Sequence, residues 1–319
     1  MQSTRWFVLW SVMLTGVTVG EAREYHVSLQ GNDANTGSST AALRTIQSAA
    51  DRAQPGDIVT VHEGIYRERI DPPRGGTSDQ RRIIFQAAPG AKVAIRGSDV
   101  IRHWKQVADD LWTVSLPNSF FGDFNPYADL IHGDFLFPNK QNQHTGQVYV
   151  DGTPLVEAAS RDELGQSPGK PFWFAEVKDG VTTLWGRFQG VDPNEKTIEI
   201  NVRQSVFYPS KERVNYITIR GFEMSQAATN WAPPTAEQIA LIGTHWSKGW
   251  IIEDNIISDS KCSGITLGKD RKTGHNVCAE NPGKDGAKPV SYTHLTLPTS
   301  AVAWGGGGWG GGWGGGGGG

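Results

Sequence analysis

The stretch that decides the fold runs from Asn215 to Gly268 and contains three informative segments, NYITIRGFEM (Asn215–Met224), WAPPTAEQIALIGTHWSKGWIIEDN (Trp231–Asn255) and CSGITLG (Cys262–Gly268). Short apolar and β-branched runs recur in these segments, and a Gly or Asn soon follows each run. No run is long enough for a helix or has a 3.6-residue period. Such spacing is typical of a solenoid whose stacked coils share one core. We therefore predict coils of a right-handed parallel β-helix, in an all-β protein.

The composition argues against several classes of partner and cofactor. The chain has 319 residues and a formal net charge of -3, which gives no support for a nucleic acid or an anionic membrane as partner. Cys262 and Cys278 form neither a disulfide framework nor a metal-ligand cluster, and Cys262 is expected as a small buried residue. We expect no metal and no organic cofactor.

The N-terminus predicts a secretory signal peptide over residues 1–22. Arg5 supplies the positive charge, Trp6–Val19 is mostly apolar, and Gly20 and Ala22 are the small residues that precede cleavage. The apolar run is shorter than the roughly 20 residues of a membrane-spanning helix, although an uncleaved anchor is the alternative. The mature protein is thus expected to be secreted or periplasmic, with no membrane contact after cleavage.

Residues 23–103 are predicted to form the first coils of the β-helix, with a cap helix over residues 45–53. Thr45 is the expected N-cap, and Pro55 with Gly56 ends the helix. A short amphipathic helix can cover the apolar end of a solenoid, as capping repeats do. The trio Tyr66, Arg67 and Glu68 is expected on a solvated outer face with a surface ion pair.

The turn cluster GNDANTGSS (Gly31–Ser39) has two interpretations. Its Asn and Asp side chains could ligate calcium, or they could hydrogen-bond their own backbone in Asx-turns. We favour the second interpretation.

Residues 104–207 have a different pattern, with longer strands that alternate in polarity. QVYV (Gln147–Val150) ends at Asp151-Gly152, a strong hairpin signal, and Val181–Phe188 and Thr197–Val202 also resemble antiparallel strands. Antiparallel hairpins between coils predict an inserted β-sandwich. The coil pattern then continues over residues 208–287.

The tail, residues 288–319, does not resemble protein sequence. PVSYTHLTLPTS (Pro289–Ser300) resembles the translation of an adapter used in DNA library preparation, and only Gly and Trp follow Ala303. The codons GGG and TGG differ by one base, so a run of G with occasional T encodes such a tail. We interpret residues 288–319 as a disordered artefact; a glycine-rich linker is the alternative.

Several segments in one order carry a family resemblance. Together with the central stretch, GDIVTVHEGIYRE (Gly56–Glu68), LPNSFFGDFNPY (Leu116–Tyr127) and FQGVDPNEKTIEINVR (Phe188–Arg203) resemble the β-xylosidases of glycoside hydrolase family 120. The resemblance implies a parallel β-helix with an inserted sandwich and a retaining mechanism on β-xylosides. That mechanism needs two carboxylates about 5 Å apart. The family's catalytic Asp and Glu would lie beyond Ala287, so no catalytic residue is assigned to this chain.

The carboxylates of the resumed coils receive structural or solvated roles. Glu253 and Asp254 are adjacent, so on a strand their side chains point to opposite faces and cannot act as a pair. The carboxylates considered are Glu223, Glu237, Glu253, Asp254 and Asp259.

Four side chains are the substrate-binding candidates: Phe135, Trp231, His245 and Trp246. Aromatic rings suit the apolar face of a sugar. Similar family members have Trp where Phe135 stands, and the change to Phe keeps stacking area but loses an N–H donor. Packing between the sandwich and the coils is the alternative role for the other three.

Three functions remain open at this point. The first is the N-terminal part of a secreted or periplasmic β-xylosidase-like glycoside hydrolase acting on a xylo-oligosaccharide or a related glycoside. The second is a non-catalytic β-helix of the cell surface that binds glycans through aromatic loops. The third is a polysaccharide lyase, which usually needs calcium and basic residues. Catalytic groups on later coils would discriminate among these three functions. The sequence does not indicate the oligomeric state.

Overall fold

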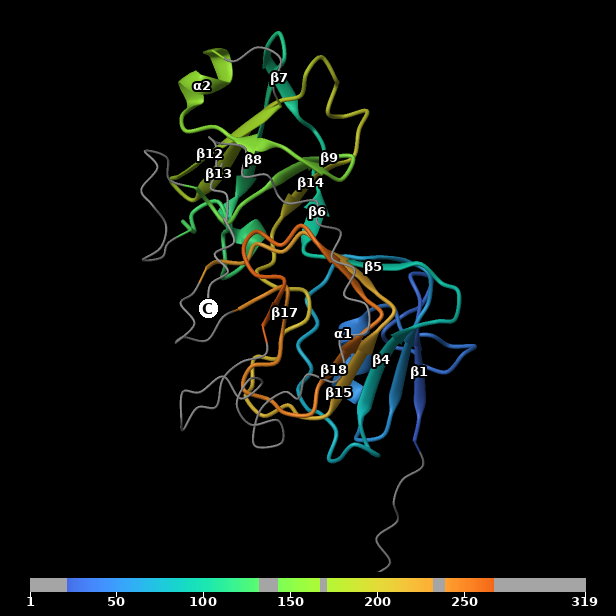
Figure 1. The fold of residues 1–319 in the computed structure, drawn as a ribbon. Coiled ribbons are helices and arrows are strands. Elements are labelled where there is room, and N and C mark those ends of the chain that lie inside the picture. Colours follow the sequence, from blue (N-terminus) through green and yellow to red (C-terminus); the bar gives the residue numbers. More distant parts are fainter. Residues whose placement is uncertain (1–21, 132–142, 167–170, 232–238, 267–319) are drawn as a thin grey trace, which may run out of the picture.

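The computed structural model describes residues 22–131, 143–166, 171–231 and 239–266. Within these ranges the chain is mostly β-strand with few helices, so the predicted all-β class is confirmed (Figure 1). The predicted tail and all but the last residue of the predicted signal peptide lie outside them. No helix in the described ranges is both long and apolar enough to cross a membrane.

The first parallel sheet contains five strands in the order β1-β2-β4-β15-β18. Val59, Phe85 and Ile219 lie side by side in register on neighbouring strands, and all three are buried. Their β-branched and aromatic side chains suit a pleated surface with one buried face. The strand bounds are β1 (Glu24–Val27), β2 (Ile58–Val61), β4 (Ile83–Ala87), β15 (Ile217–Arg220) and β18 (Ile251–Glu253).

The second parallel sheet has four strands in the order β19-β16-β5-β3. Tyr66, Ile95, Met224 and Ile257 are aligned across it and are buried. The strands are β3 (Gly64–Tyr66), β5 (Val93–Arg96), β16 (Glu223–Ser225) and β19 (Ile256–Ser258).

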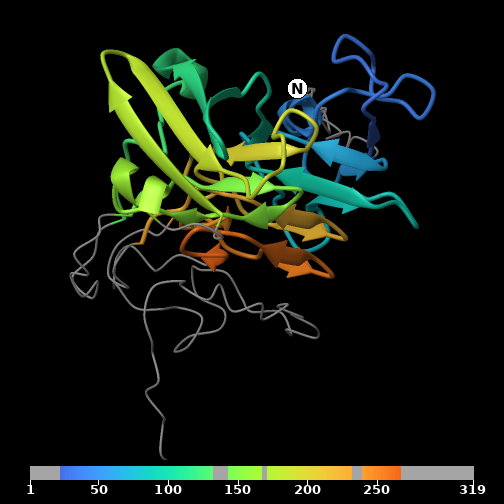
Figure 2. The ribbon, with the colours of Figure 1, turned by 90° about the horizontal axis from the view of Figure 1, so that it is seen from above.

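A third parallel ladder is shorter. Ile70 pairs with Phe207, and Phe207 pairs with Ile242, the first residue of β17 (Ile242–Gly243). The strand β17 then pairs in parallel with β20 (Ile265–Thr266). Each strand of the first sheet from β2 on is therefore followed by one of the second sheet and then by a member of this ladder. Figure 2 shows the strands stacked in chain order, from blue to orange.

The helix predicted over residues 45–53 spans Ile46–Arg52 (α1). Thr45 is its N-cap, and its side chain accepts a hydrogen bond from Ser48 N. Ile46 and Ala49 are buried, and α1 packs against β1 and β2. The helix thus covers one end of the parallel stack, where β1 is the terminal strand.

Two further sheets form the antiparallel part of the molecule, at the top of Figure 1. One has the order β10-β9-β14-β6 and the other β11-β12-β13-β8-β7, in which only the β11-β12 pair is parallel. The strands are β6 (Ser98–Val100), β7 (Lys105–Ala108), β8 (Leu111–Pro117), β9 (Val148–Val150), β10 (Thr153–Pro154), β11 (Val156–Glu157), β12 (Phe172–Lys178), β13 (Val181–Arg187) and β14 (Ile198–Asn201). The short helices are η1 (Asn118–Phe121) and α2 (Arg161–Gln166).

A separate apolar core lies between these two sheets. Val148 and Ile198 from one sheet and Trp173 and Leu184 from the other belong to a single buried cluster. The hairpin expected at Asp151-Gly152 joins β9 to β10, and both turn residues have positive φ, as a type I′ turn requires.

The antiparallel strands span Ser98–Asn201, whereas the sequence pattern places the change of character at Trp104 and Phe207. The strand β6 is too short to show alternation in polarity. It joins the antiparallel sheet because it pairs with β14, about a hundred residues later in the chain. Phe207 belongs to the third parallel ladder. The chain therefore leaves the parallel stack directly after β5 and re-enters it at the next ladder position.

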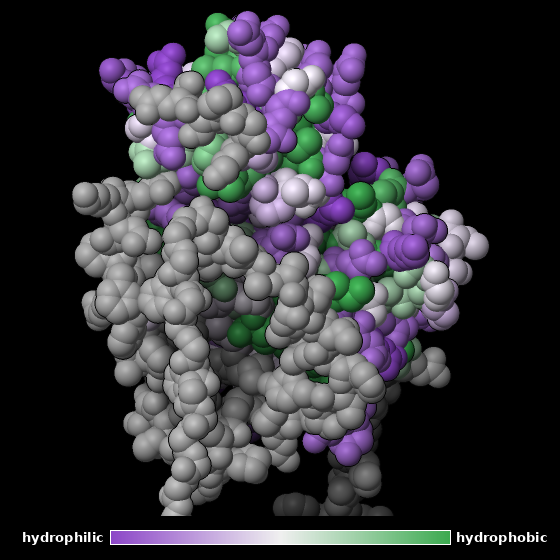
Figure 3. Space-filling view, turned by 45° about the horizontal axis from the view of Figure 1, so that its top comes forward, coloured by the Kyte–Doolittle hydropathy of each residue, from purple (hydrophilic) through white to green (hydrophobic). Residues whose placement is uncertain are grey.

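The expectation of a solvated face for Tyr66, Arg67 and Glu68 is wrong. Tyr66 is 2% exposed, Arg67 binds the buried Glu199, and the Glu68 carboxylate accepts hydrogen bonds from the backbone of Ile46 and Gln47 at the start of α1. The antiparallel part and α1 cover this face. On the face shown in Figure 3, hydrophilic residues dominate the antiparallel part, with smaller apolar areas among them.

Candidate functional site

A buried carboxylate fixes the base of the antiparallel part to the parallel stack. The side chain of Glu199 on β14 is fully buried, and its oxygens lie 2.6 Å from Arg67 Nη2 and 2.7 Å from Arg96 Nη1. Gln226, after β16, donates to the same carboxylate at 3.2 Å. Burial opposes ionisation, but the hydrogen bonds from Arg67 and Arg96 prevail and lower the pKa of Glu199.

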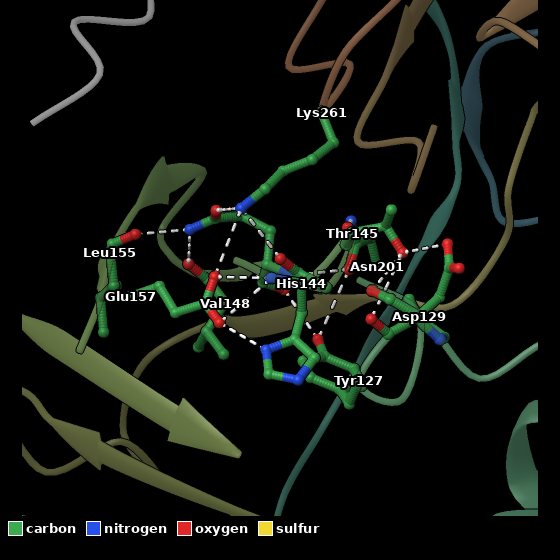
Figure 4. Close-up of polar contacts among 12 residues, drawn as sticks. Tyr127, Asp129, His144, Thr145, Val148, Leu155, Glu157, Asn201 and Lys261 are labelled. Atoms are coloured by element: carbon green, nitrogen blue, oxygen red, sulfur yellow. Dashed lines mark hydrogen bonds and ion pairs between the residues drawn. The ribbon is translucent and has the colours of Figure 1, made fainter. Parts of the chain in front are cut away.

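A second set of polar contacts joins the turn after β19 to the loop before β9 (Figure 4). We call this boundary between the parallel stack and the antiparallel part the junction. Lys261 Nζ donates to Gly146 O at 3.1 Å and to Gln147 Oε1 at 2.9 Å, and it lies 4.0 Å from Glu157 Oε2. Burial lowers the pKa of Lys261, and the nearby Glu157 carboxylate opposes that shift. The ammonium group is therefore held by fixed acceptors on the antiparallel part.

His144 lies on the other side of Glu157. Its Nδ1 is 2.5 Å from Glu157 Oε1, and its backbone N–H also donates to the carboxylate. Because a carboxylate only accepts, Nδ1 carries the proton. His144, Glu157 and Lys261 thus form one chain of polar contacts across the junction.

Trp231 lies beside a third contact of the junction. Asn230 Nδ2 donates to Asp129 Oδ2 at 3.1 Å and to Leu130 O at 3.0 Å, and Trp231 N donates to Asn230 Oδ1. Asp129 Oδ2 also accepts a hydrogen bond from Thr145. These contacts fix the backbone of Trp231 next to the antiparallel part.

Phe135 lies outside the described residues, but the residues that flank its segment are described. Ile131 N donates to Gln143 O at 2.8 Å, and Leu130 forms an antiparallel bridge with His144. The Asn230 side chain binds Leu130 O in this same pair. Asn230, the chain neighbour of Trp231, therefore binds Leu130, one of the described residues that flank this segment.

His245 and Trp246 lie just beyond β17, after Thr244, and both have left-handed backbone conformations, with φ of 45° and 57°. Such conformations cost free energy in non-glycine residues and occur often at functional sites. His245 Nδ1 is 2.8 Å from Pro209 O, so Nδ1 donates and Nε2 is left as the acceptor of the neutral ring. Half-buried Trp246 is its chain neighbour.

Tyr208 supports the His245 ring. The two rings are stacked, with centroids 5.2 Å apart and an angle of 25° between their planes. A Cβ at Gly243 would be 2.6 Å from the Tyr208 ring, so only glycine lets Tyr208 lie there unshifted. The Arg69 guanidinium lies 6.0 Å from the centre of the same ring. We call the stacked Tyr208 and His245 the aromatic platform, which Trp246 follows in the chain.

The predicted site residues thus fall into two places. Trp231 lies at the junction before β17, and His245 and Trp246 lie shortly after that strand. Sequence reasoning missed Tyr208, Asp129 and Lys261. The signal for Tyr208 is its position after the ladder residue Phe207, because alternation along a strand turns it to the outer face.

The described carboxylates that follow the antiparallel part lie at exposed or loop positions. Glu253 lies 3.7 Å from Arg220, both partly exposed, and Glu223 is exposed. Asp254 and Asp259 occupy turns with positive φ. Glu237 lies outside the described ranges.

The turn cluster at Gly31–Ser39 satisfies its own backbone. Asn32 Oδ1 accepts a hydrogen bond from Ala34 N, as in an Asx-turn, and the Asp33 carboxylate accepts from Arg44 N, Thr45 N and the Thr45 hydroxyl. The carboxylate oxygens of Asp33 thereby join the loop to the start of α1. These contacts favour the turn interpretation over calcium ligation.

Comparison with known proteins gives the class to which this architecture is similar. Residues 101–171 match the model of the glycoside hydrolase 120 insertion domain, which is the antiparallel part up to β12. The chain is therefore like the glycoside hydrolase 120 proteins.

Individual proteins and solved structures are similar to this chain to different extents. The structure of XylC in complex with xylose has 46% sequence identity and a TM-score of 0.75, over 80% of this chain and 43% of XylC. A second structure, described as a glycoside hydrolase, has 12% identity and a TM-score of 0.50, over 76% of this chain and 63% of its own, and supports the fold alone. The "Uncharacterized protein YwoF" of Bacillus subtilis (strain 168) is 33% identical over 81 residues, which are 25% of this chain and 17% of YwoF. This chain spans less than half the length of XylC.

Proposed function

We propose that this chain is the N-terminal part of a glycoside hydrolase of the β-xylosidase type, which hydrolyses xylo-oligosaccharides or related glycosides with retention of configuration. The observation that carries the proposal is the 46% identity to XylC, a protein whose structure holds xylose, over 80% of the present chain. The match of residues 101–171 to the glycoside hydrolase 120 insertion domain supports it independently.

The proposal includes the fold. The three parallel ladders are coils of a right-handed parallel β-helix, α1 is its N-terminal cap, and the antiparallel part is an inserted sandwich. The regular succession of strands from the first sheet to the second sheet and the third ladder supports this architecture. Solenoid coils stacked this way bury a continuous apolar core, and the aligned Ile, Val and Phe side chains provide one.

The catalytic carboxylates of the longer protein lie beyond Ala287, on later coils. Hydrolysis with retention requires a nucleophile and an acid/base about 5 Å apart. Glu199 and Glu157 are unsuitable because arginine, lysine and histidine side chains already bind them at the junction. Their role is to hold the sandwich on the coils.

The substrate-binding surface includes Phe135, Trp231, His245 and Trp246. Trp231 offers an indole at the junction between the two parts of the molecule, and ligand sites occur often at such junctions. His245 offers Nε2 as an acceptor for a sugar hydroxyl, because Nδ1 is occupied by Pro209 O. The tryptophan and phenylalanine rings suit the apolar face of a pyranose.

The protein acts outside the cytoplasm. The charged, apolar and small-residue pattern of residues 1–22 supports secretion or export to the periplasm. A glycosidase for extracellular oligosaccharides would meet its substrate there.

Binding can be tested on the 319-residue chain. We expect NMR-monitored titration with xylose and xylobiose to give saturable shifts, which Trp231→Ala and His245→Ala reduce. The matched control is Trp112→Ala, a half-buried tryptophan on β8 that is not among the predicted binding residues. Binding that survives both Trp231→Ala and His245→Ala would contradict the proposed surface.

Activity requires the longer protein. The gene is amplified from source DNA, sequenced past the codon for Ala287, and the product is assayed on an aryl β-xyloside. Release of the aryl group with β-xylose as first product supports retaining hydrolysis. Saturable binding with no hydrolysis by the longer product would instead favour a glycan-binding protein. An unsaturated product from a separate assay on a uronate-containing polysaccharide would favour a lyase.

A further inference from the structure

Two histidines meet on the outer face of the first parallel sheet, away from the junction. His26 lies in β1 and His62 directly follows β2. Their neighbours Tyr25, Val27 and Val61 are buried in the core. Because side chains alternate along a strand, both imidazoles project from the opposite, outward face, and both are half-buried.

The two rings present nitrogen atoms to each other. His26 Nδ1 lies 3.1 Å from His62 Nε2, and the ring centroids are 5.3 Å apart. One of the two nitrogens must be unprotonated for this contact, so at least one imidazole is neutral. Neutral imidazole nitrogen is the form that ligates a metal ion.

The spacing of the nitrogens suits two ligands of one ion. Zinc–imidazole bonds of about 2.0–2.1 Å, with bond angles at the metal between a right angle and the tetrahedral value, place two nitrogens about 2.9–3.4 Å apart. The observed 3.1 Å falls inside that range. An ion at these bond lengths would lie off the line that joins the two nitrogens and would take the place of the hydrogen-bonded proton.

The backbones that carry the pair are fixed. His26 N donates to Gly37 O at 2.7 Å, Leu43 N donates to His26 O at 2.8 Å, and His62 N donates to Val27 O at 2.8 Å. The Tyr66 hydroxyl also donates to His62 O at 2.9 Å. Fixed ligand backbones lower the entropy lost when a metal binds.

We propose that His26 and His62 form a surface site for a divalent late transition-metal ion, such as Zn²⁺ or Cu²⁺. Imidazole nitrogen suits these ions, and Cu²⁺ binds most tightly among the first-row divalent ions. Among the described residues no group of three His, Cys, Asp or Glu side chains is placed to hold a metal, so water or an external ligand completes the coordination. The site is distinct from the proposed glycosidase surface and does not depend on it.

The test uses the untagged 319-residue chain, with ZnCl₂ and CuCl₂ as probes in isothermal titration calorimetry. We expect one saturable site that His26→Gln and His62→Gln each remove. The exposed His103 provides the matched control, and His103→Gln should bind as the wild type does. The Cu²⁺ complex should also give an electron paramagnetic resonance spectrum with two-nitrogen coupling, lost in the same two variants.

A second test uses only the wild type, so it does not depend on whether a variant folds. Adding Zn²⁺ should perturb the side-chain NMR signals of His26 and His62 together, before those of the other histidines. Unchanged affinity in His26→Gln and His62→Gln would overturn the proposal. So would the absence of saturable binding, or first perturbation of other histidines.

Discussion

Lys261 Nζ lies 2.9 Å from Gln147 Oε1, which joins the turn after β19 to the residue before β9. A turn of the parallel stack is thereby bound to the antiparallel part more than a hundred residues earlier in the chain. Glu157, at 4.0 Å, balances the charge. The junction is therefore polar and buried, and its contacts are the first to test.

Replacing Lys261 with Met should destabilise the protein. The change removes two hydrogen bonds from a charged donor and leaves Glu157 without this cation, so we expect the free energy of unfolding to fall by about 2–3 kcal/mol. Urea unfolding measures the loss. Lys196→Met is the matched control, because Lys196 pairs with Asp151 on the surface, where both side chains are about half exposed. Equal losses in the two variants would contradict the structural role of Lys261.

The contacts of Glu199 with Arg67 and Arg96 should make the free energy of unfolding decrease at acidic pH. In Glu199→Gln, Arg67 and Arg96 lose their buried carboxylate, so we expect a loss of about 3–5 kcal/mol near neutral pH. Since the folded pKa of Glu199 lies below the ordinary value of 4.5, its stabilisation is present above that value and disappears as pH falls through the folded pKa. The difference between wild type and variant should therefore shrink in acid.

A partly exposed ion pair provides the comparison for Glu199. Asp99 lies 3.0 Å from Arg203, and their side chains are 29% and 24% exposed. We expect Asp99→Asn to cost less than about 1 kcal/mol. Urea unfolding at several pH values from neutral to acid measures both variants. A pH-independent gap between wild type and Glu199→Gln would show that the carboxylate is not the titrating group.

The stability of the protein at alkaline pH should depend on Tyr66. Burial, followed by the Glu68 carboxylate, raises the pKa of Tyr66 from 10.0 to about 12. In unfolded chains the phenol ionises near 10, whereas the folded protein keeps the proton, so stability falls as pH rises from 10 toward 12. The loss is up to about 1.4 kcal/mol for each pH unit in that window.

The Tyr66→Phe variant removes this titration. It also loses the hydrogen bond to His62 O, so it should be less stable at neutral pH, with a shallower alkaline slope. Unfolding by urea at about pH 9, 10 and 11 gives the slopes. Parallel pH profiles for variant and wild type would contradict the assignment.

Local sequence patterns predicted the elements whose cause is local. The run Ile217–Ile219 became part of β15, Asp151-Gly152 became the β9–β10 turn, and Thr45 became the cap of α1. In each, the side-chain period or the backbone preference of a few adjacent residues is sufficient. The three parallel ladders follow from the repeating interval of such runs.

Contacts between distant segments could not be predicted in the same way. Arg67 has a charged, locally exposed pattern, and only the return of the chain at Glu199, 132 residues later, turns it into a buried partner. Similarly, nothing near Asn230 indicates that it binds Asp129, 101 residues earlier. Of the candidate site, the sequence predicted individual aromatic residues, but their division between the junction and the platform required the structure.

The last prediction concerns the aromatic platform. A Cβ at Gly243 would lie 2.6 Å from the Tyr208 ring and 2.8 Å from Thr266 Oγ1, so Gly243→Ala must displace a ring that is only 4% exposed. We expect a loss of about 1–3 kcal/mol, as for other overpacked sites. Because His245 stacks on Tyr208, the displacement should also shift the His245 side-chain NMR signals and weaken the proposed binding of xylose.

Gly264 is the matched control, since it lies in the turn before β20 and a Cβ there would make an ordinary contact, 3.5 Å from Ile257 Cγ2. Gly264→Ala should stay within about 0.5 kcal/mol of the wild type and leave the His245 signals in place. Thermal unfolding and the NMR titration with xylose compare both variants. If Gly243→Ala is destabilised but keeps the His245 signals and xylose binding, Tyr208 serves packing alone. If it matches the wild type in every measurement, the close approach of Tyr208 to Gly243 is wrong.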